Sequence, residues 1–150
     1  MTKLFKMSSG NARKLVSKLV FKNGLIPAVA KNNSGKVLMV GFMNRKSLLK
    51  TLTTGYMHYY SRSRRRIWMK GEESGFKQRV LEVRVNCENN SLLFTVEQEG
   101  LGACHMGYET CFYRKASIRG VFKKVEEKKF NPKRVYGPSR LKTSKKLLKE

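Results

Sequence analysis

Residues 79–97 read RVLEVRVNCENNSLLFTVE, and this stretch decides the fold. Its first half places Leu81, Val83 and Val85 at every second position with charged residues between them, which is the period of a half-buried β-strand. Its second half, residues 91–97, is rich in apolar and β-branched residues and follows a tight polar turn. The stretch therefore predicts an antiparallel hairpin.

Four further strands are predicted around this hairpin. Residues 25–30 and 37–42 are apolar runs joined by Asn-Asn-Ser-Gly at 32–35, a composition typical of a tight turn, so they form a second hairpin. The aromatic residues of 56–61 indicate another strand, and residues 111–118 indicate a last one.

Two helices are predicted from helical spacing and capping residues. Residues 12–21 repeat apolar side chains at the spacing of one helix face. Residues 44–54 start at Asn44, a good N-cap, and end at Gly55. These elements predict a mainly β (α+β) fold, in which a curved, barrel-like antiparallel sheet carries one or two short helices.

The C-terminal part of the chain differs in composition from the rest. Residues 100–111 contain three glycines and show no period, so we expect a loop. Beyond Phe130 the chain contains two prolines and many lysines, and we expect a partly disordered tail with room for one short helix.

The net charge of +23 is unevenly distributed along the chain. Residues 1–71 contain no acidic residue, residues 72–114 are slightly acidic, and the chain is basic again from Lys115 onward. Such a charge attracts polyanions such as nucleic acid or phosphorylated substrates. Lysines scattered among apolar residues are also typical of an ordinary solvated surface, and this second interpretation describes the pattern better.

Membrane and secretory classes are not indicated. No apolar run approaches the ~20 residues of a membrane-spanning helix, and residues 1–10 lack the apolar stretch of a secretory signal. The basic, serine-containing N-terminus leaves a transit peptide open on composition alone.

Three cysteines carry the strongest chemical signal. An odd number of cysteines without a secretory signal argues against a disulfide framework. Cys87 lies in a turn, whereas Cys104 and Cys111 lie in the glycine-rich loop, next to His105. Three thiolates with an open fourth position are typical of a catalytic zinc site, but spacing alone leaves buried, inert cysteines equally open.

A basic and aromatic segment precedes the cysteines. Residues 61–66, SRSRRR, offer hydroxyl and guanidinium groups to phosphates and are flanked by Tyr59, Tyr60 and Trp68. The same composition also describes a surface that binds nucleic acid.

Several motifs together resemble one family. GLIPA at 24–28, VLMVGFMN at 37–44, SRSRRRIWMKGEESGFKQRV at 61–80 and ACHMGYETCFYR at 103–114 are similar, in this order, to the motifs of phosphoribosyl-AMP cyclohydrolases. The resemblance is colinear over about residues 15–114. Because that family carries a short helical lead before its first motif, the resemblance favours a cytoplasmic protein without a transit peptide.

The resemblance implies a reaction, a metal and an assembly. The family adds water to the adenine ring of phosphoribosyl-AMP and breaks the bond between N1 and C6, in histidine biosynthesis. Its zinc ligands match Cys87, Cys104 and Cys111 and are shared between the two subunits of a homodimer. His105 matches a candidate proton carrier of catalysis. The residues implied to bind the substrate are Arg62, Ser63, Arg64, Lys70, Glu72, Ser74 and Gln78.

The resemblance also divides the chain and exposes two departures. Residues 1–114 correspond to the catalytic domain, with 12–21 as its helical lead, and residues 115–150 form a basic C-terminal extension. The family assigns Mg²⁺ to an Asp-Cys-Asp-x-Asp turn, where this chain has Asn86, Glu88 and Asn90 around the cysteine. Amides are weaker, neutral ligands, so a weakened magnesium site is expected.

The second departure is Phe76, which stands where the family commonly has a polar His or Asn. A competing hypothesis follows from the departures and the charge. In that hypothesis the chain is a catalytically impaired, zinc-stabilised paralogue that binds nucleic acid or another polyanion.

Overall fold

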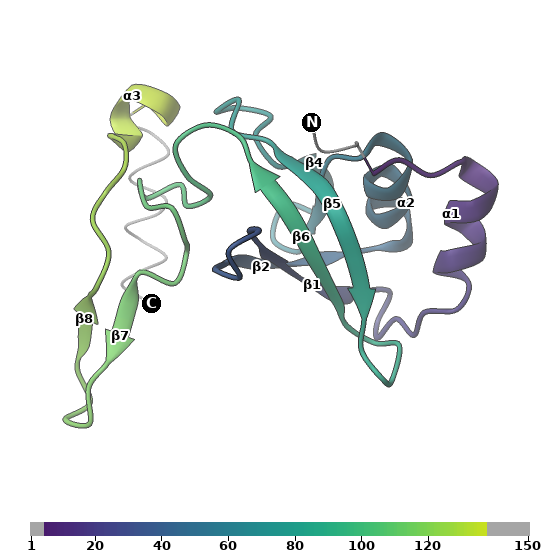
Figure 1. The fold of residues 1–150 in the computed structure, drawn as a ribbon, viewed down its shortest axis with the longest axis horizontal. Helices are drawn as coiled ribbons and strands as arrows, with labels where there is room; N and C mark the ends of the chain where they lie inside the picture. The colour runs from purple at the N-terminus through teal and green to yellow at the C-terminus, as the bar shows by residue number, and fades with distance from the viewer. Residues whose placement is uncertain (1–4, 138–150) are drawn as a thin grey trace.

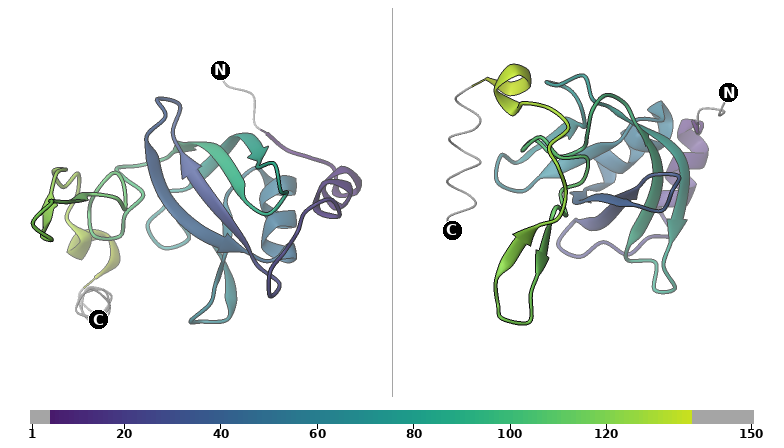
Figure 2. Two further views of the ribbon diagram at one scale, coloured as in Figure 1. Left: turned by 90° about the horizontal axis from the view of Figure 1, so that it is seen from below. Right: turned by 60° about the vertical axis from the view of Figure 1, so that its left-hand side comes forward.

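The computed structural model describes residues 5–137 and shows a sheet with the first two helices on one side and an extended C-terminal hairpin (Figures 1 and 2). The elements in chain order are α1 (Ser9–Val16), β1 (Ile26–Lys31), β2 (Val37–Met43), α2 (Arg45–Thr54), β3 (His58–Ser61), β4 (Arg66–Met69), β5 (Gln78–Val85), β6 (Leu92–Gln98), β7 (Arg114–Ala116), β8 (Phe122–Lys124) and α3 (Pro132–Tyr136). Within residues 5–137, no helix is both long and apolar enough to cross a bilayer.

The main sheet has four strands in the order β2-β1-β6-β5. Both predicted hairpins are confirmed, because β1 pairs antiparallel with β2 and β5 pairs antiparallel with β6. The two hairpins join through β1 and β6, which run parallel, with Ala28 opposite Leu92. The mainly β, α+β class is therefore correct, but the all-antiparallel, barrel-like sheet is wrong.

The sheet stays open because other segments pair with its two outer strands. At the β2 edge, the amide of Cys111 donates to the carbonyl of Leu38 at 2.7 Å. At the β5 edge, the amide of Val80 donates to the carbonyl of Gly55 at 2.8 Å. Part of each outer edge is therefore already paired with a segment other than a strand of the main sheet.

Helix α2 begins and ends where its capping residues predict. The Asn44 side chain accepts a hydrogen bond from the Ser47 amide at 2.8 Å, and Gly55 takes a left-handed conformation with φ of 81°. Helix α1 is shorter than expected and ends at Val16. The two helices contribute Ala12, Val16, Leu48 and Leu52 to one core with the main sheet.

A bulge in β5 changes which side chains reach that core. The pairing of β5 with β6 shifts between Val80 and Glu82, so Leu81 has no opposite residue. Gln78 and Val80 are consequently fully buried, while Val85 is exposed. Leu81, Val83 and Val85 were expected to share one face of the strand. Of the three, only Val83 packs against the core.

Two smaller hairpins complete the described chain. The β3–β4 hairpin packs on the main sheet where Tyr59 lies over Gly41 of β2, a position at which a Cβ would come within 2.5 Å of the tyrosine ring. The β7–β8 hairpin projects from the body (Figure 1) and covers only part of the strand expected at 111–118. Helix α3 lies in the predicted tail, whose last residues, 138–150, lie outside the described part.

Candidate functional site

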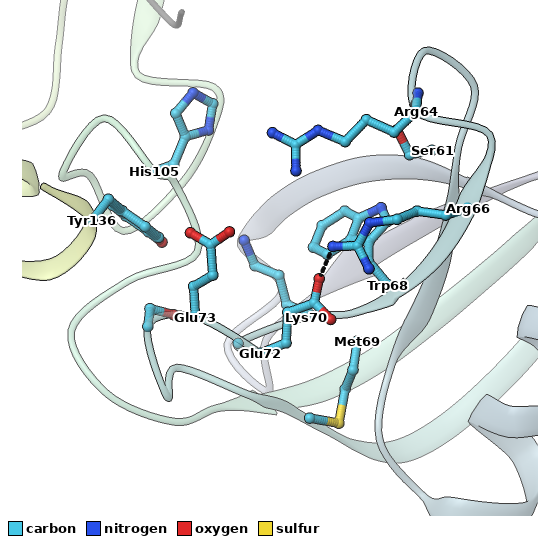
Figure 3. A pocket seen from close by; sticks show the side chains of 12 residues that line it. Ser61, Arg64, Arg66, Trp68, Met69, Lys70, Glu72, Glu73, His105 and Tyr136 are labelled. Atoms are coloured by element: carbon cyan, nitrogen blue, oxygen red, sulfur yellow. Dashed lines mark hydrogen bonds and ion pairs between the residues drawn. The ribbon is translucent and has the colours of Figure 1, made fainter. Parts of the chain in front are cut away.

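An open pocket lies between the β3–β4 hairpin and the loop that follows β6 (Figure 3). One wall comes from the hairpin, the floor from the turn after β4, and the opposite wall from two residues distant in sequence, His105 and Tyr136. The lining residues are Ser61, Arg64, Arg66, Trp68, Met69, Lys70, Gly71, Glu72, Glu73, Ser74, His105 and Tyr136.

The hairpin wall carries cationic and hydroxyl groups. The turn is fixed by the Arg64 amide, which donates to the Ser61 hydroxyl at 3.2 Å. Arg66 forms an ion pair with Glu72, which neutralises it and fixes its position. The guanidinium of Arg64 instead extends into the pocket (Figure 3), where it can bind an anionic ligand.

Lys70 connects this pocket to the cysteine loop. Its side chain is buried, and its ammonium group donates to the carbonyl of Ala103 and lies 5.8 Å from the ring centroid of Trp68. A buried ammonium stabilises negative charge nearby. The charge of Lys70 favours the thiolate form of both Cys104 and Cys111, although it is the smallest of the causes that act on either thiol.

A tight loop brings Cys104 and Cys111 together. The Cys104 amide donates to the Tyr108 carbonyl at 3.0 Å, and the rings of Tyr108 and Tyr113 stack at 3.7 Å between centroids. The loop is held to the sheet edge by the backbone of Cys111. Its two thiols consequently face each other and share a hydrogen bond.

The two thiols have unequal acidity. The hydrogen bond from Cys111 is the main cause that lowers the pKa of Cys104 to about 6, supported by the amides of Met106 and Tyr108. The same hydrogen bond and the desolvation of its thiol raise the pKa of Cys111, although the residue as a whole is exposed. The pair therefore holds one thiolate at neutral pH, the form that binds metals.

Cys87 lies at the other end of the sheet. It is exposed in the β5–β6 turn, before β6, whereas Cys104 follows β6. That seven-residue strand is ~23 Å long at the usual rise per residue. Among residues 5–137, no three metal-binding side chains lie close enough to hold one ion.

Cys104 and Cys111 fit zinc as two of its ligands. Two adjacent cysteines, one of them already acidic, are suitable zinc ligands, and thiolate is the ligand zinc commonly takes in proteins. Within one chain Cys87 does not reach the same ion as the Cys104–Cys111 pair, because the length of β6 separates them.

The turn around Cys87 does not fit Mg²⁺. The Asn86 side-chain oxygen already accepts hydrogen bonds from the amides of Asn90 and Ser91, at 2.9 and 3.0 Å. The Asn86 and Asn90 amide groups bond each other, and Asn90 also donates to the Glu88 carboxylate at 3.2 Å. Magnesium prefers carboxylate oxygens, and this turn supplies one carboxylate among side chains that satisfy each other.

The structure brings together only some of the residues expected to bind substrate. Arg64, Lys70, Glu72 and Ser74 line the pocket with His105. The others lie elsewhere: Arg62 stacks over the Phe42 ring at 4.2 Å, Ser63 faces Ser61, and Gln78 is fully buried.

Gln78 belongs to a buried chain of hydrogen bonds. The hydroxyl of Tyr59 donates to Gln78 at 2.8 Å, and the Gln78 amide donates to Gln98 at 3.0 Å. Burial raises the pKa of Tyr59, so its hydroxyl stays protonated and remains a donor.

Seven pocket residues were not among those that the resemblance implies for substrate binding or catalysis: Ser61, Arg66, Trp68, Met69, Gly71, Glu73 and Tyr136. The first six lie inside the quoted segment 61–80, and the basic stretch 61–66 with Trp68 beside it had already indicated three of them. No signal in the sequence pointed to Tyr136, because it comes from the basic extension.

Comparisons with known proteins point to one family. Residues 39–113 match the family model described as phosphoribosyl-AMP cyclohydrolase. The chain is 51% identical to the phosphoribosyl-AMP cyclohydrolase of Methanosarcina acetivorans over 119 residues, which are 79% of this chain and 95% of that protein. It is 49% identical to the enzyme of the same name from Chlorobium chlorochromatii over 116 residues, 77% of this chain and 84% of the relative.

Proposed function

This chain belongs to the phosphoribosyl-AMP cyclohydrolase family, and we propose that it opens the adenine ring of phosphoribosyl-AMP by hydrolysis, in histidine biosynthesis, with zinc bound by Cys87, Cys104 and Cys111. The observation that carries the proposal is the pair of thiols of Cys104 and Cys111, one of them acidic, beside His105, which lines a pocket with cationic groups. The proposal places the enzyme in the cytoplasm, where thiols stay reduced.

The pocket suits a phosphorylated purine. Arg64 offers a guanidinium to a phosphate, and the hydroxyls of Ser61 and Ser74 can add hydrogen bonds. Trp68 contributes an aromatic surface near Lys70, next to which a planar base can pack. The cationic group therefore suits the phosphate end of the substrate, and the aromatic surface suits its purine end.

The chemistry adds one water across the N1–C6 bond of the ring. The oxygen of water bonds to C6, the electron pair of the broken C6–N1 bond stays on N1, and N1 takes up a proton. His105 is the side chain proposed to carry that proton, because it lines the pocket beside Cys104 and an imidazole can both donate and accept a proton. When bound at the thiolates, zinc supplies the Lewis acidity that makes water a nucleophile near neutral pH.

The separated cysteines support a homodimer in which each zinc has ligands from two chains. A second copy that presents its Cys87 to the Cys104–Cys111 pair completes a three-thiolate site with one open position. Such a site is incomplete in the monomer, so association and metal binding stabilise each other.

Two apolar surfaces, one near Cys111 and one near Cys87, fit the same dimer. The β7–β8 hairpin begins just after Cys111 and exposes Ile118, Val121 and Phe122 to solvent. A separate, mainly apolar groove is bordered by Asn90 and Ser91, just after Cys87. A zinc ion shared by Cys87 and Cys111 of two copies brings the hairpin of one toward the groove of the other. Burial of exposed apolar side chains stabilises such an interface.

The direct test is a spectrophotometric assay of phosphoribosyl-AMP hydrolysis with purified protein, combined with metal analysis. We expect turnover and about one zinc per chain, and the loss of both in Cys104→Ser. A protein that holds zinc and binds nucleic acid but never hydrolyses the substrate, with zinc or with magnesium added, would favour the polyanion-binding hypothesis instead.

A further inference from the structure

The C-terminal extension returns from the projecting hairpin to the body of the molecule. The amide of Val125 donates to the Tyr113 carbonyl at 2.8 Å, and the amide of Lys129 donates to the Gly107 carbonyl at 2.7 Å. Gly107 has a φ of 101°, and a Cβ at this position would lie 2.6 Å from the carbonyl oxygen of Phe130. The extension therefore packs directly on the loop that carries Cys104.

Aromatic contacts fix the next part of the extension. The ring of Phe130 meets the ring of Phe76 edge to face, with 5.2 Å between centroids, and lies 6.5 Å from the ring of Tyr136. Phe76 stands where the family commonly has a polar residue, and in this chain it anchors the extension. A polar side chain at this position would not provide the same apolar contact.

Helix α3 then presents Tyr136 to the pocket. The Asn131 side chain caps the helix by accepting from the Lys133 amide at 3.0 Å, and Pro132 is buried at its first turn. Tyr136 is the last helical residue, and its ring lies on the same pocket wall as His105, facing the wall that carries Arg64 (Figure 3).

We infer that Tyr136 is a further substrate-contacting residue, which binds the purine ring of the ligand and sets specificity for that end of it. The identity of the ligand rests on the proposed function. His105, the proposed proton carrier, marks the wall where the ring reacts, and Tyr136 shares this wall, whereas the cationic group for phosphate lies opposite on Arg64. An uncharged aromatic ring with one hydroxyl suits a purine better than a phosphate.

Tyr136 lies outside residues 39–113, the part of the chain that matches the family model. The extension is therefore part of the binding site in this chain, and the Phe76–Phe130 contact is the means by which the body of the protein positions it. Phe130 acts through Tyr136 and is a positioning residue.

The test uses the full-length protein and the fluorescence of Trp68, the only tryptophan in the sequence and a lining residue of the pocket. Titration with AMP, which carries a purine and one phosphate, gives a dissociation constant without turnover. The variants are Tyr136→Ala, Tyr136→Phe and Phe130→Ala, with Lys133→Ala as the matched control on the same helix, where the side chain is exposed.

We expect Tyr136→Ala to weaken AMP binding and to raise KM by about tenfold, the size of a lost base–aromatic contact, with a smaller change in kcat. Phe130→Ala should weaken AMP binding and raise KM in the same way. Tyr136→Phe should keep most of the affinity for AMP, and Lys133→Ala should bind AMP like the unmodified protein. Unchanged AMP affinity and KM in Tyr136→Ala would overturn the inference. Loss of AMP affinity in a chain that lacks hydrolytic activity would overturn the proposed function and leave this inference standing.

Discussion

The hydroxyl of Tyr59 donates a 2.8 Å hydrogen bond to the side-chain oxygen of Gln78, at a point where both side chains are buried. Tyr59 comes from the β3–β4 hairpin and Gln78 from the main sheet, so this bond joins the pocket wall to the core. Gln78, which resemblance placed among the substrate ligands, here supports the wall from behind.

Removing the hydroxyl of Tyr59 leaves the buried side-chain oxygen of Gln78 without this donor. We expect Tyr59→Phe to lower the free energy of unfolding by about 1–3 kcal/mol, the usual cost of such a loss. Urea denaturation measures it, with Tyr60→Phe, at the partly exposed neighbouring tyrosine, as the control. Equal stability of the two variants would show that the buried bond contributes nothing.

The two arginines of the Ser-Arg-Ser-Arg segment have different surroundings. Arg64 extends into the pocket, whereas Arg62 stacks over Phe42 in a separate groove. We therefore expect Arg64→Ala to raise KM for phosphoribosyl-AMP by roughly tenfold or more, from the loss of a charge-assisted hydrogen bond, with a smaller change in kcat. Steady-state kinetics should show a lesser effect for Arg62→Ala. The reverse order would contradict the assignment of this pocket to the substrate.

A zinc site shared between chains predicts complementation. Cys87→Ser and Cys104→Ser should each be inactive alone. After mixing and subunit exchange, the mixed dimer has one complete site, so about a quarter of the activity should return if the chains pair at random. A mixture of Cys104→Ser with Cys111→Ser is the control, since every site there lacks a ligand. No recovery in the first mixture, with exchange verified by mass spectrometry, would rule out the shared site.

The amide-rich turn predicts weak dependence on magnesium. Because Asn86 and Asn90 bond each other and leave one carboxylate, added Mg²⁺ should change the activity little. The triple variant Asn86→Asp, Glu88→Asp and Asn90→Asp should gain activation by Mg²⁺ and should bind it in calorimetry. Tight Mg²⁺ binding by the unmodified protein would contradict this interpretation of the turn.

His58 predicts a loss of stability in mild acid. Burial, more than any other cause, lowers the pKa of His58 below its usual 6.5. The unfolded chain therefore binds a proton at a pH where the folded chain does not, so stability decreases as the pH falls through about 6.5 toward the lowered pKa. Urea midpoints at about pH 7.5 and about pH 5.5 should differ less in His58→Gln than in the unmodified protein. His105→Gln, which changes the only other histidine, is the control.

Local sequence determined the elements that depend on neighbouring residues. The alternation in 79–97, the Asn-Asn-Ser-Gly turn, and Asn44 with Gly55 at the ends of α2 all act over a few residues, so their strands, turn and helix follow from spacing and backbone preference. The same holds for the basic segment 61–66, whose hydroxyls and guanidinium groups lie within one short hairpin.

Only the tertiary structure decided how these elements meet. The parallel pairing of β1 with β6 joins the two hairpins into one sheet, and the bulge at Leu81 determines that Gln78 faces the core. Contact between Phe76 and Phe130 places Tyr136 in the pocket from far along the chain. The spacing of residues along the chain cannot determine such placements, because they depend on which distant surfaces pack together. The free energy of burying those surfaces depends on the whole packed chain.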